Sequence, residues 1–179
     1  LVEFPPDYRL FLERLHTVDP PMIGARYVDS VAKIRGEYRA FPDWSAVTPG
    51  LEAALALPFD GLQFDVEHSG LWLKSWGPRP TIPTQCRAEL RRRVAAAPRL
   101  IPVYQHRYLL ADPCLAGNPV LSVHQSDIIV YGVDLRSYLL VEFARLLGLD
   151  ADREFEKGWQ AHPRPIEEVP FWGEIAAWS

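Results

Sequence analysis

The sequence lacks any long apolar run, and it contains few cysteines. No stretch approaches the roughly 18 consecutive apolar residues of a membrane-spanning helix. The first residues, LVEFPPDYRLFLERL, carry acids and prolines where a signal peptide has a basic start and an apolar core. The two cysteines, Cys86 and Cys114, have neither the spacing of a metal site nor that of a disulfide framework. These absences predict a cytoplasmic protein in a reducing compartment, with no membrane partner.

Catalytic signatures are missing as well. The sequence contains no HxH, HExxH or CxxC pairing and no glycine-rich loop of the kind that cradles phosphate. Ser122 lies two residues before His124, on one face of a predicted strand, but no GxSxG elbow surrounds it. We therefore expect no catalytic residue, no set of metal ligands and no cofactor.

The sequence does contain enough apolar bulk for one packed domain. Of its 179 residues, 48% are hydrophobic, and six Trp, seven Tyr and eight Phe supply large rings for a core. We expect a single domain over 1–179. In this domain, 1–47 form a helical N-terminal segment, and 149–179 form an aromatic-rich tail that packs back on the rest.

Charge is divided unevenly along the chain. Residues 1–99 hold 13 basic and 12 acidic side chains, whereas 100–179 hold 6 basic and 11 acidic ones. Nucleic-acid binding needs a basic footprint, so this balance argues against a nucleic-acid partner. An acidic half favours a basic partner. A solvated acidic surface without a partner is the alternative interpretation.

Apolar residues recur with the helical period in several segments. Thr48 and Pro49 predict the start of a helix, and Pro58 predicts its end. Asp134 and Gly148 predict the N-cap and the C-cap of a later helix. In all, the pattern predicts helices over 8–15, 28–40, 49–57, 85–97 and 135–147.

Two segments carry strand patterns instead. Alternation at 64–67, a Ser69-Gly70 turn and the apolar residues that follow predict a hairpin over 62–76. Residues 99–132 contain short runs of β-formers separated by turn residues, which predicts an antiparallel meander. Pro102 predicts an edge strand or the start of a strand. Helices and meander together predict an α+β fold.

The predicted hairpin carries the first candidate binding residues. Its alternation places Asp65 and Glu67 on one strand face and His68 on the other. Two carboxylates on one face can serve in acid–base chemistry or bind a divalent cation, or they form the solvent side of a half-buried strand. Trp72 and Trp76 are candidate interface residues, because tryptophan is favoured at binding hot spots, although core packing is the commoner role of such rings.

The meander supplies the remaining candidates. His106 and His124 are predicted on separate strands, where Arg107 and Asp127 could approach them across the sheet. With His68 and Asp127, the two histidines offer ligand types that suit zinc or iron. Independent roles are the more common outcome for histidines spread this widely along a chain.

Three segments resemble a known family. RLIPVYQHRYLLADPCLAGNPVLSVHQSDIIVYG at 99–132 and FDVEHSGLWLKSWGPRP at 64–80 are similar to segments of bacterial members of the SUKH superfamily, and so is the closing VPFWGEIAAW. The resemblance implies an α+β domain with one central, mainly antiparallel sheet flanked by helices. Many bacterial members are immunity proteins that neutralise secreted toxins by binding them. The superfamily shares no catalytic residues, so none is transferred to this chain.

The sequence therefore predicts a non-enzymatic protein-binding module, of which a bacterial toxin-immunity protein is the form that the resemblance suggests. Its expected partner is a protein, such as a basic toxin domain. The alternative is a small metal-binding protein or hydrolase that uses the histidine and carboxylate residues of the strands. The candidate binding residues are Asp65, Glu67, His68, Trp72, Trp76, His106, Arg107 and Asp127.

Overall fold

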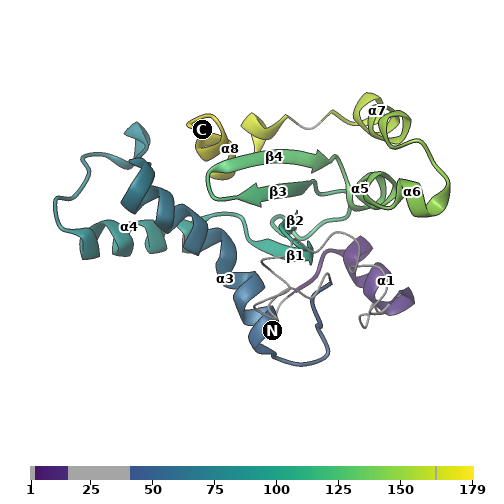
Figure 1. Ribbon diagram of the computed structural model, residues 1–179, viewed down its shortest axis with the longest axis horizontal. Helices are drawn as coiled ribbons and strands as arrows, with labels where there is room; N and C mark the ends of the chain where they lie inside the picture. The colour runs from purple at the N-terminus through teal and green to yellow at the C-terminus, as the bar shows by residue number, and fades with distance from the viewer. Residues whose placement is uncertain (1–2, 16–40, 164) are drawn as a thin grey trace.

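The computed structural model describes residues 3–15, 41–163 and 165–179, and it centres on a four-stranded antiparallel sheet (Figure 1). The strands lie in the order of the chain, so each one pairs with its neighbour in sequence. This arrangement confirms the predicted α+β class and the antiparallel meander. The strands are β1 (Leu100–Tyr104), β2 (Arg107–Leu110), β3 (Val120–His124) and β4 (Asp127–Gly132).

Helices cover both faces of the sheet, and alternate strand residues face the two layers. Tyr108 and Leu121 lie in an apolar cluster with Leu62 of one layer, whereas Leu109 lies in a cluster with Tyr8 of the other. The first layer is formed by α3 (Pro49–Phe64), α4 (Pro83–Ala96) and α8 (Trp172–Ala176). The second layer is formed by α1 (Pro6–Arg14) and α5 (Leu135–Glu142). The other helical elements are η1 (Asp65–Ser69), η2 (Lys74–Trp76), α6 (Ala144–Leu147), α7 (Ala151–Ala161) and η3 (Ile166–Glu168).

Helix α1 occupies the first segment in which a helix was predicted, but it begins differently. It starts at Pro6, two residues before the predicted start, with Pro5 as its N-cap residue and Asp7 in its first turn. The Tyr8 hydroxyl donates a hydrogen bond to the Pro102 carbonyl at 3.0 Å, which ties α1 to β1. Strand β1 is an edge strand, as Pro102 predicts. The helix predicted over 28–40 lies outside the described residues.

Helix α3 begins at Pro49, with the Thr48 side chain accepting from the Leu51 backbone N–H, as predicted. The predicted end at Pro58 is wrong, because the helix continues to Phe64. A proline inside a helix leaves the carbonyl four residues earlier without its usual donor. Here that carbonyl belongs to Ala54, and it accepts a hydrogen bond from the Tyr108 hydroxyl at 2.9 Å. A side chain of β2 thus replaces the missing backbone donor.

The hairpin predicted over 62–76 is also wrong. Leu62 and Val66 are both buried at a spacing of four, which continues the inner face of α3 into the π-helical turn η1. Gly70, with φ of 81°, ends this turn in the left-handed conformation. The alternation at 64–67, which predicted a strand, is therefore part of a helical pattern that continues from α3.

Two tight turns close the hairpins of the sheet at the same end. Gln105 and His106 form the β1–β2 turn, and Gln125 and Ser126 form the β3–β4 turn. The first residue of each has a positive φ, 50° for Gln105 and 59° for Gln125. The prediction that His106 lies on a strand is therefore wrong, and His124 is the last residue of β3. Helix α3 approaches the second turn closely, since a Cβ on Gly61 would lie 3.1 Å from the Gln125 Cα.

The helix predicted after the sheet is observed as two consecutive helices, α5 and α6, and the two predicted caps lie at their outer ends. Asp134 caps α5 through a capping box with Ser137, and Gly148 ends α6 with φ of 67°. Helix α4 also matches its prediction, with Cys86 and Leu90 buried. It begins at Pro83, with Ile82 as its N-cap residue, two residues before the predicted start at 85.

The last C-terminal residues contribute Val169, Trp172 and Ile175 to the core, whereas α7 stays at the surface. Trp172 of α8 is 2% exposed, and its indole N–H donates to the Pro98 carbonyl at 2.8 Å. Helix α7, by contrast, buries none of its residues fully. None of the described helices combines the length and the apolar character that crossing a membrane requires.

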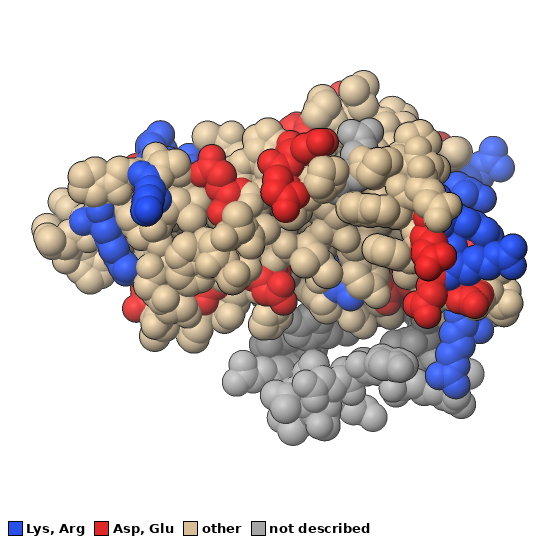
Figure 2. Space-filling view, turned by 90° about the horizontal axis from the view of Figure 1, so that it is seen from above, with Lys and Arg blue, Asp and Glu red and all other residues tan. Residues whose placement is uncertain are grey.

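Charged side chains are not mixed evenly over the surface. Figure 2 shows the face that carries α7 and α8, with basic side chains gathered at its two ends and acidic ones between them. The exposed acids of this region include Asp152 and Glu156 of α7, Glu167 and Glu168 of η3, and Glu174 of α8. Acidic side chains therefore predominate on this surface, although α7 also exposes the basic side chains of Arg153 and Lys157.

Replacing Tyr108 by Phe tests its role in α3. We expect Tyr108→Phe to lower the free energy of unfolding by about 1.5 kcal/mol, because a partly buried carbonyl loses its donor. The loss should shrink in the Pro58→Ala background, which restores a backbone N–H at this turn. Urea denaturation followed by circular dichroism measures all four proteins. Equal losses in both backgrounds would contradict the assigned role of the hydroxyl.

Candidate functional site

A polar cluster lies on the α5 side of the sheet, near the two tight turns. Arg107 of β2, Ser122 of β3 and Ile129 of β4 stand opposite one another in register. The Arg107 Nη1 donates to the Ser122 Oγ at 2.7 Å, and the guanidinium carbon lies 3.8 Å from the centre of the Tyr131 ring. The Arg107 Nε lies 3.7 Å from the Glu142 Oε2 of α5. We call Arg107, Ser122, Tyr131 and Glu142 the Arg107 cluster.

Burial dominates the electrostatics of this cluster. It raises the pKa of Glu142, and the Arg107 charge opposes the shift. Burial also raises the pKa of the neighbouring Tyr138. Within the described part of the chain, the Arg107 Nε, the Glu142 Oε2 and the Tyr138 hydroxyl have no hydrogen-bond partner. The Arg107–Glu142 ion pair therefore lies in apolar surroundings without a direct hydrogen bond. Desolvation of its charges costs free energy, and removing either partner would leave the other charge without compensation.

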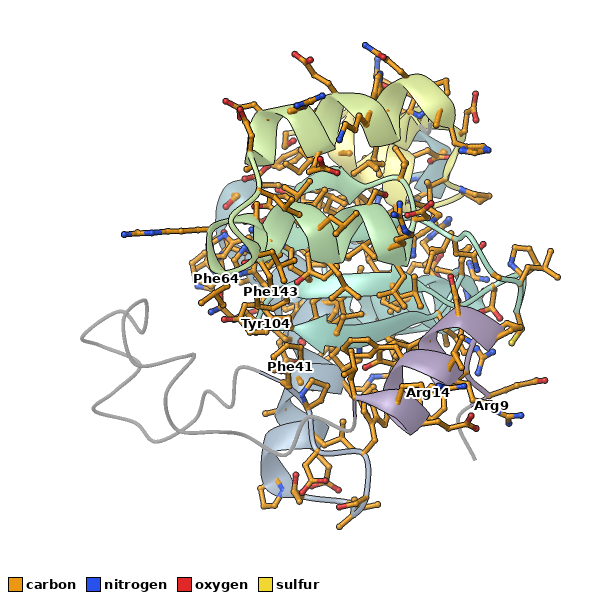
Figure 3. All side chains as sticks on the ribbon, turned by 90° about the vertical axis from the view of Figure 1, so that its right-hand side faces the viewer. Arg9, Arg14, Phe41, Phe64, Tyr104 and Phe143 are labelled. Carbon is orange, nitrogen blue, oxygen red and sulfur yellow. The ribbon has the colours of Figure 1, made fainter. Side chains whose placement is uncertain are left out.

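An aromatic group borders the cluster at the end of α5. Figure 3 shows Phe41, Tyr104 and Phe143 next to one another, and their ring centres are 4.8 to 5.8 Å apart. Phe143 directly follows Glu142 in sequence, and Tyr104 ends β1. Tyr104 pairs with Arg107 in the strand register, so this aromatic group adjoins the Arg107–Glu142 pair, whose side chains are only 14% and 20% exposed.

The two histidines of the meander lie next to the Arg107 cluster. The rings of His106 and His124 are 6.5 Å apart, and His124 pairs with Asp127 across the second turn. Burial lowers the pKa of His106 to about 4, assisted by the charges of Arg107 and His124 and opposed by Asp127. Nowhere in residues 3–15, 41–163 and 165–179 do three His, Cys, Asp or Glu side chains come together in a group that could hold a metal ion.

Asp65 has a different role from the one predicted, because it lies in a helical turn and not on a strand. It is buried, and its Oδ2 accepts from the Ser126 backbone N–H at 2.9 Å. Its Oδ1 accepts from the Ser69 hydroxyl at 2.8 Å. Both carboxylate oxygens are thus engaged in hydrogen bonds within the fold. Asp65 therefore has a structural role, which is to support the β3–β4 turn.

Asp65 and Glu67 do not share a face as predicted, because both lie in the helical turn η1, where residues two apart point in different directions. Glu67 is exposed and accepts a hydrogen bond from the Gln63 side chain at 2.7 Å. The ring of His68 stacks on Phe64 at 4.4 Å, and its Nδ1 lies 3.0 Å from the Phe64 carbonyl oxygen. These contacts are local to the end of α3, and they bring neither residue to the Arg107 cluster.

The two candidate tryptophans pack with the C-terminal segment. Trp76 is buried, stacks on Phe171 at 6.2 Å and lies beneath the Arg93 guanidinium. Trp72 is half-buried, meets Trp76 edge-on at 5.3 Å and donates its indole N–H to the Gly77 carbonyl. Both rings therefore serve mainly to fix the loop between η1 and α4 against the tail.

The structure thus brings together three of the eight candidates, His106, Arg107 and Asp127, with Asp65 beneath the same end of the sheet. Sequence reasoning missed Tyr131 and Glu142 as partners of Arg107. The strand register could have indicated Tyr131, since it shares the sheet face of Ser122 and Ile129. Glu142 comes from a helix, and no spacing in the sequence relates it to Arg107.

Comparisons of this chain with models of known protein families, with curated proteins and with solved structures find no match. The function must therefore be argued from the residues of this chain.

The low pKa of His106 predicts a pH dependence of stability. Its folded pKa of about 4 lies below the ordinary 6.5, so between these values the unfolded chain binds more protons. Stability is therefore expected to fall as the pH drops from 6.5 toward 4. Urea denaturation across this range should show a shallower fall for His106→Asn, and NMR of the wild type should place the midpoint of His106 near pH 4. An ordinary midpoint near 6.5 would contradict the burial of this ring.

The Arg107–Glu142 pair predicts a coupled effect on stability. Arg107→Ala should lower the free energy of unfolding by about 2 kcal/mol, since it leaves Glu142 half-buried without a counter-charge. Arg107→Ala combined with Glu142→Gln should recover part of this loss. Thermal and urea unfolding of the two single variants and the double variant measure the coupling. Strict additivity would mean that the two side chains do not interact.

Proposed function

We propose that this protein is a non-enzymatic protein-binding module whose partner is a basic polypeptide. The observation that carries the proposal is the acidic region formed by α7, η3 and α8. Among the described residues, the exposed side chains of Asp152, Glu156, Glu167 and Glu168 have no ion-pair partner within 4 Å. Unpaired acids gathered on one face attract a basic protein and accelerate its association.

The geometry of the reactive side chains favours binding over catalysis. Asp65 uses both carboxylate oxygens to hold a turn, and Arg107 is engaged by Ser122, Tyr131 and Glu142. A catalytic group must face a space that a substrate can enter. In the described residues these charged groups face one another and the apolar layers. The surface is therefore better suited to binding another protein than to catalysis.

The specific form of this proposal is a toxin-immunity protein. The resemblance of 64–80 and 99–132 to bacterial SUKH proteins supports it, and so does the acidic surface, which complements a toxin domain that is basic. Such a protein would act in the cytoplasm of the cell that it protects. The two unpaired cysteines, Cys86 and Cys114, suit that reducing compartment.

Binding assays with the products of the adjacent genes test the proposal. Each neighbouring gene product is purified and titrated with this protein by isothermal calorimetry at 50 and 300 mM NaCl. We expect one basic product to bind with a dissociation constant in the nanomolar range, weakening at the higher salt because screened charges contribute less. Absence of binding to every one of these products, or binding that does not respond to salt, would contradict the proposal.

A further inference from the structure

One side of α7 combines large rings with acids. Asp152, Phe155, Glu156 and Trp159 follow the spacing i, i+3, i+4 and i+7, which places them on one side of the helix. Phe155 is 43% exposed and Trp159 37% exposed, whereas large rings are normally buried. On the adjoining β4, Ile129 is 51% exposed although it lies in mid-strand. We call Ile129, Tyr131, Asp152, Phe155, Glu156 and Trp159 the acidic–aromatic face.

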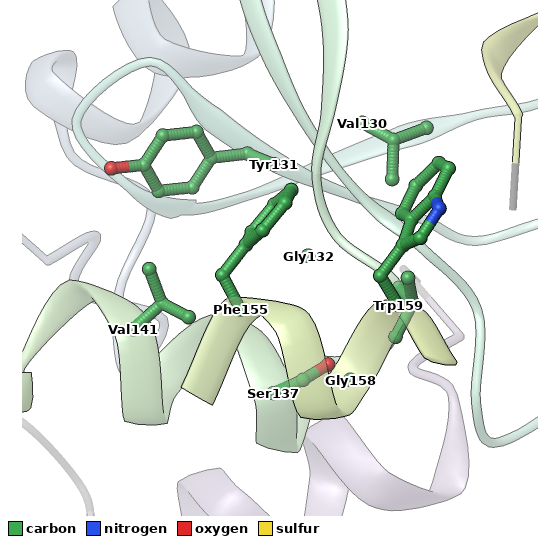
Figure 4. Close-up of a pocket in the computed structure, with 9 residues that line it drawn as sticks. Val130, Tyr131, Gly132, Ser137, Val141, Phe155, Gly158 and Trp159 are labelled. Atoms are coloured by element: carbon green, nitrogen blue, oxygen red, sulfur yellow. The ribbon is translucent and has the colours of Figure 1, made fainter. Parts of the chain in front are cut away.

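The three rings of this face adjoin one another. Figure 4 shows Phe155 between Tyr131 and Trp159, with Val130 beside the Trp159 ring. The rings of Phe155 and Trp159 stack at 6.2 Å with an interplanar angle of 12°. The cavity beneath them, about 10 Å³, has room for a single water molecule at most, so a small-molecule ligand does not fit there. The face therefore offers an outer surface for contact and no internal binding pocket.

The face is held rigidly from below. Gly158 lies so close to α5 that a Cβ on it would stand 2.9 Å from the Ser137 Cβ, and Asp150 caps the start of α7. The guanidinium of Arg107 lies over the Tyr131 ring. Rings that are already fixed lose little conformational freedom on binding, which makes them effective anchors for a partner.

The charges around the rings select the chemistry of the partner. Asp152 lies one turn before Phe155 and Glu156 one turn before Trp159, neither with an ion-pair partner among the described residues, and the exposed Asp127 lies two residues before Ile129. The basic residues of the helix, Arg153 and Lys157, lie off this side, and Lys157 pairs with Glu154. Nucleic acids and anionic lipid surfaces are repelled by such a rim. A polypeptide that presents lysine or arginine is attracted by it, and the aliphatic stems of those residues can lie on the rings.

We infer that the acidic–aromatic face is the surface that contacts the basic polypeptide. This inference rests on the proposed function and adds to it the place of contact. The rings supply an apolar centre and the carboxylates a charged rim, the usual arrangement of a protein–protein interface.

Site-directed variants of the face test the inference against the neighbouring gene product that binds most tightly. Trp159→Ala is expected to weaken binding at least tenfold, because it removes a central ring. Asp152→Lys combined with Glu156→Lys is expected to weaken it at least tenfold and to flatten its salt dependence. This double variant alters exposed side chains only, so it remains informative if Trp159→Ala disturbs the fold. Calorimetry measures affinity, and circular dichroism confirms folding.

Glu13→Lys combined with Asp60→Lys is the matched control, since it makes the same charge change at exposed positions of α1 and α3. We expect it to change affinity less than twofold. If a gene product binds but both double variants weaken it equally, or neither does, the place of contact is wrong while the proposed function stands. If no gene product binds, the proposed function itself is overturned. Sedimentation of the wild type and Trp159→Ala covers one further outcome: a dimer lost in the variant would identify the face as a self-contact and overturn the inference.

Discussion

The hydrogen bond from the Ser126 backbone N–H to the buried Asp65 carboxylate is the contact on which the rest of the arrangement depends. It joins the end of the α3 layer to the turn between β3 and β4, while Gly61 lets the helix approach that turn closely. The position of this turn sets where β4 begins and which of its residues face α5. Tyr131 of the Arg107 cluster and Ile129 of the acidic–aromatic face both owe their position to this turn.

Much of the fold follows from local signals in the sequence. The meander was predictable because short β-rich runs alternate with turn residues, and the α5–α6 segment was predictable because Asp134 and Gly148 cap its ends. The end of α3 was not predictable in this way. The group that makes Pro58 acceptable is the hydroxyl of Tyr108, which belongs to another part of the chain and reaches Ala54 only in the folded protein.

Three members of the candidate site were predictable from the sequence, but their partners and their roles were not. His106, Arg107 and Asp127 were identified because charged and titratable side chains are conspicuous in a β-rich segment. Their environment could not be inferred, since the partner Glu142 comes from a helix and the burial of His106 depends on the packing around its turn. The pair Asp65 and Glu67 was misjudged for the opposite reason, because a true local pattern was assigned the wrong period.

The hydroxyl of Tyr108 also has a consequence for how the protein opens. Helix α3 has no backbone donor for the carbonyl of Ala54. This carbonyl is hydrogen-bonded only while Tyr108 of β2 is in place. Slow opening events that release β2 from the sheet must therefore weaken the helix at the same moment. In the terms of native-state exchange, the centre of α3 and the inner strands therefore belong to one cooperative unit.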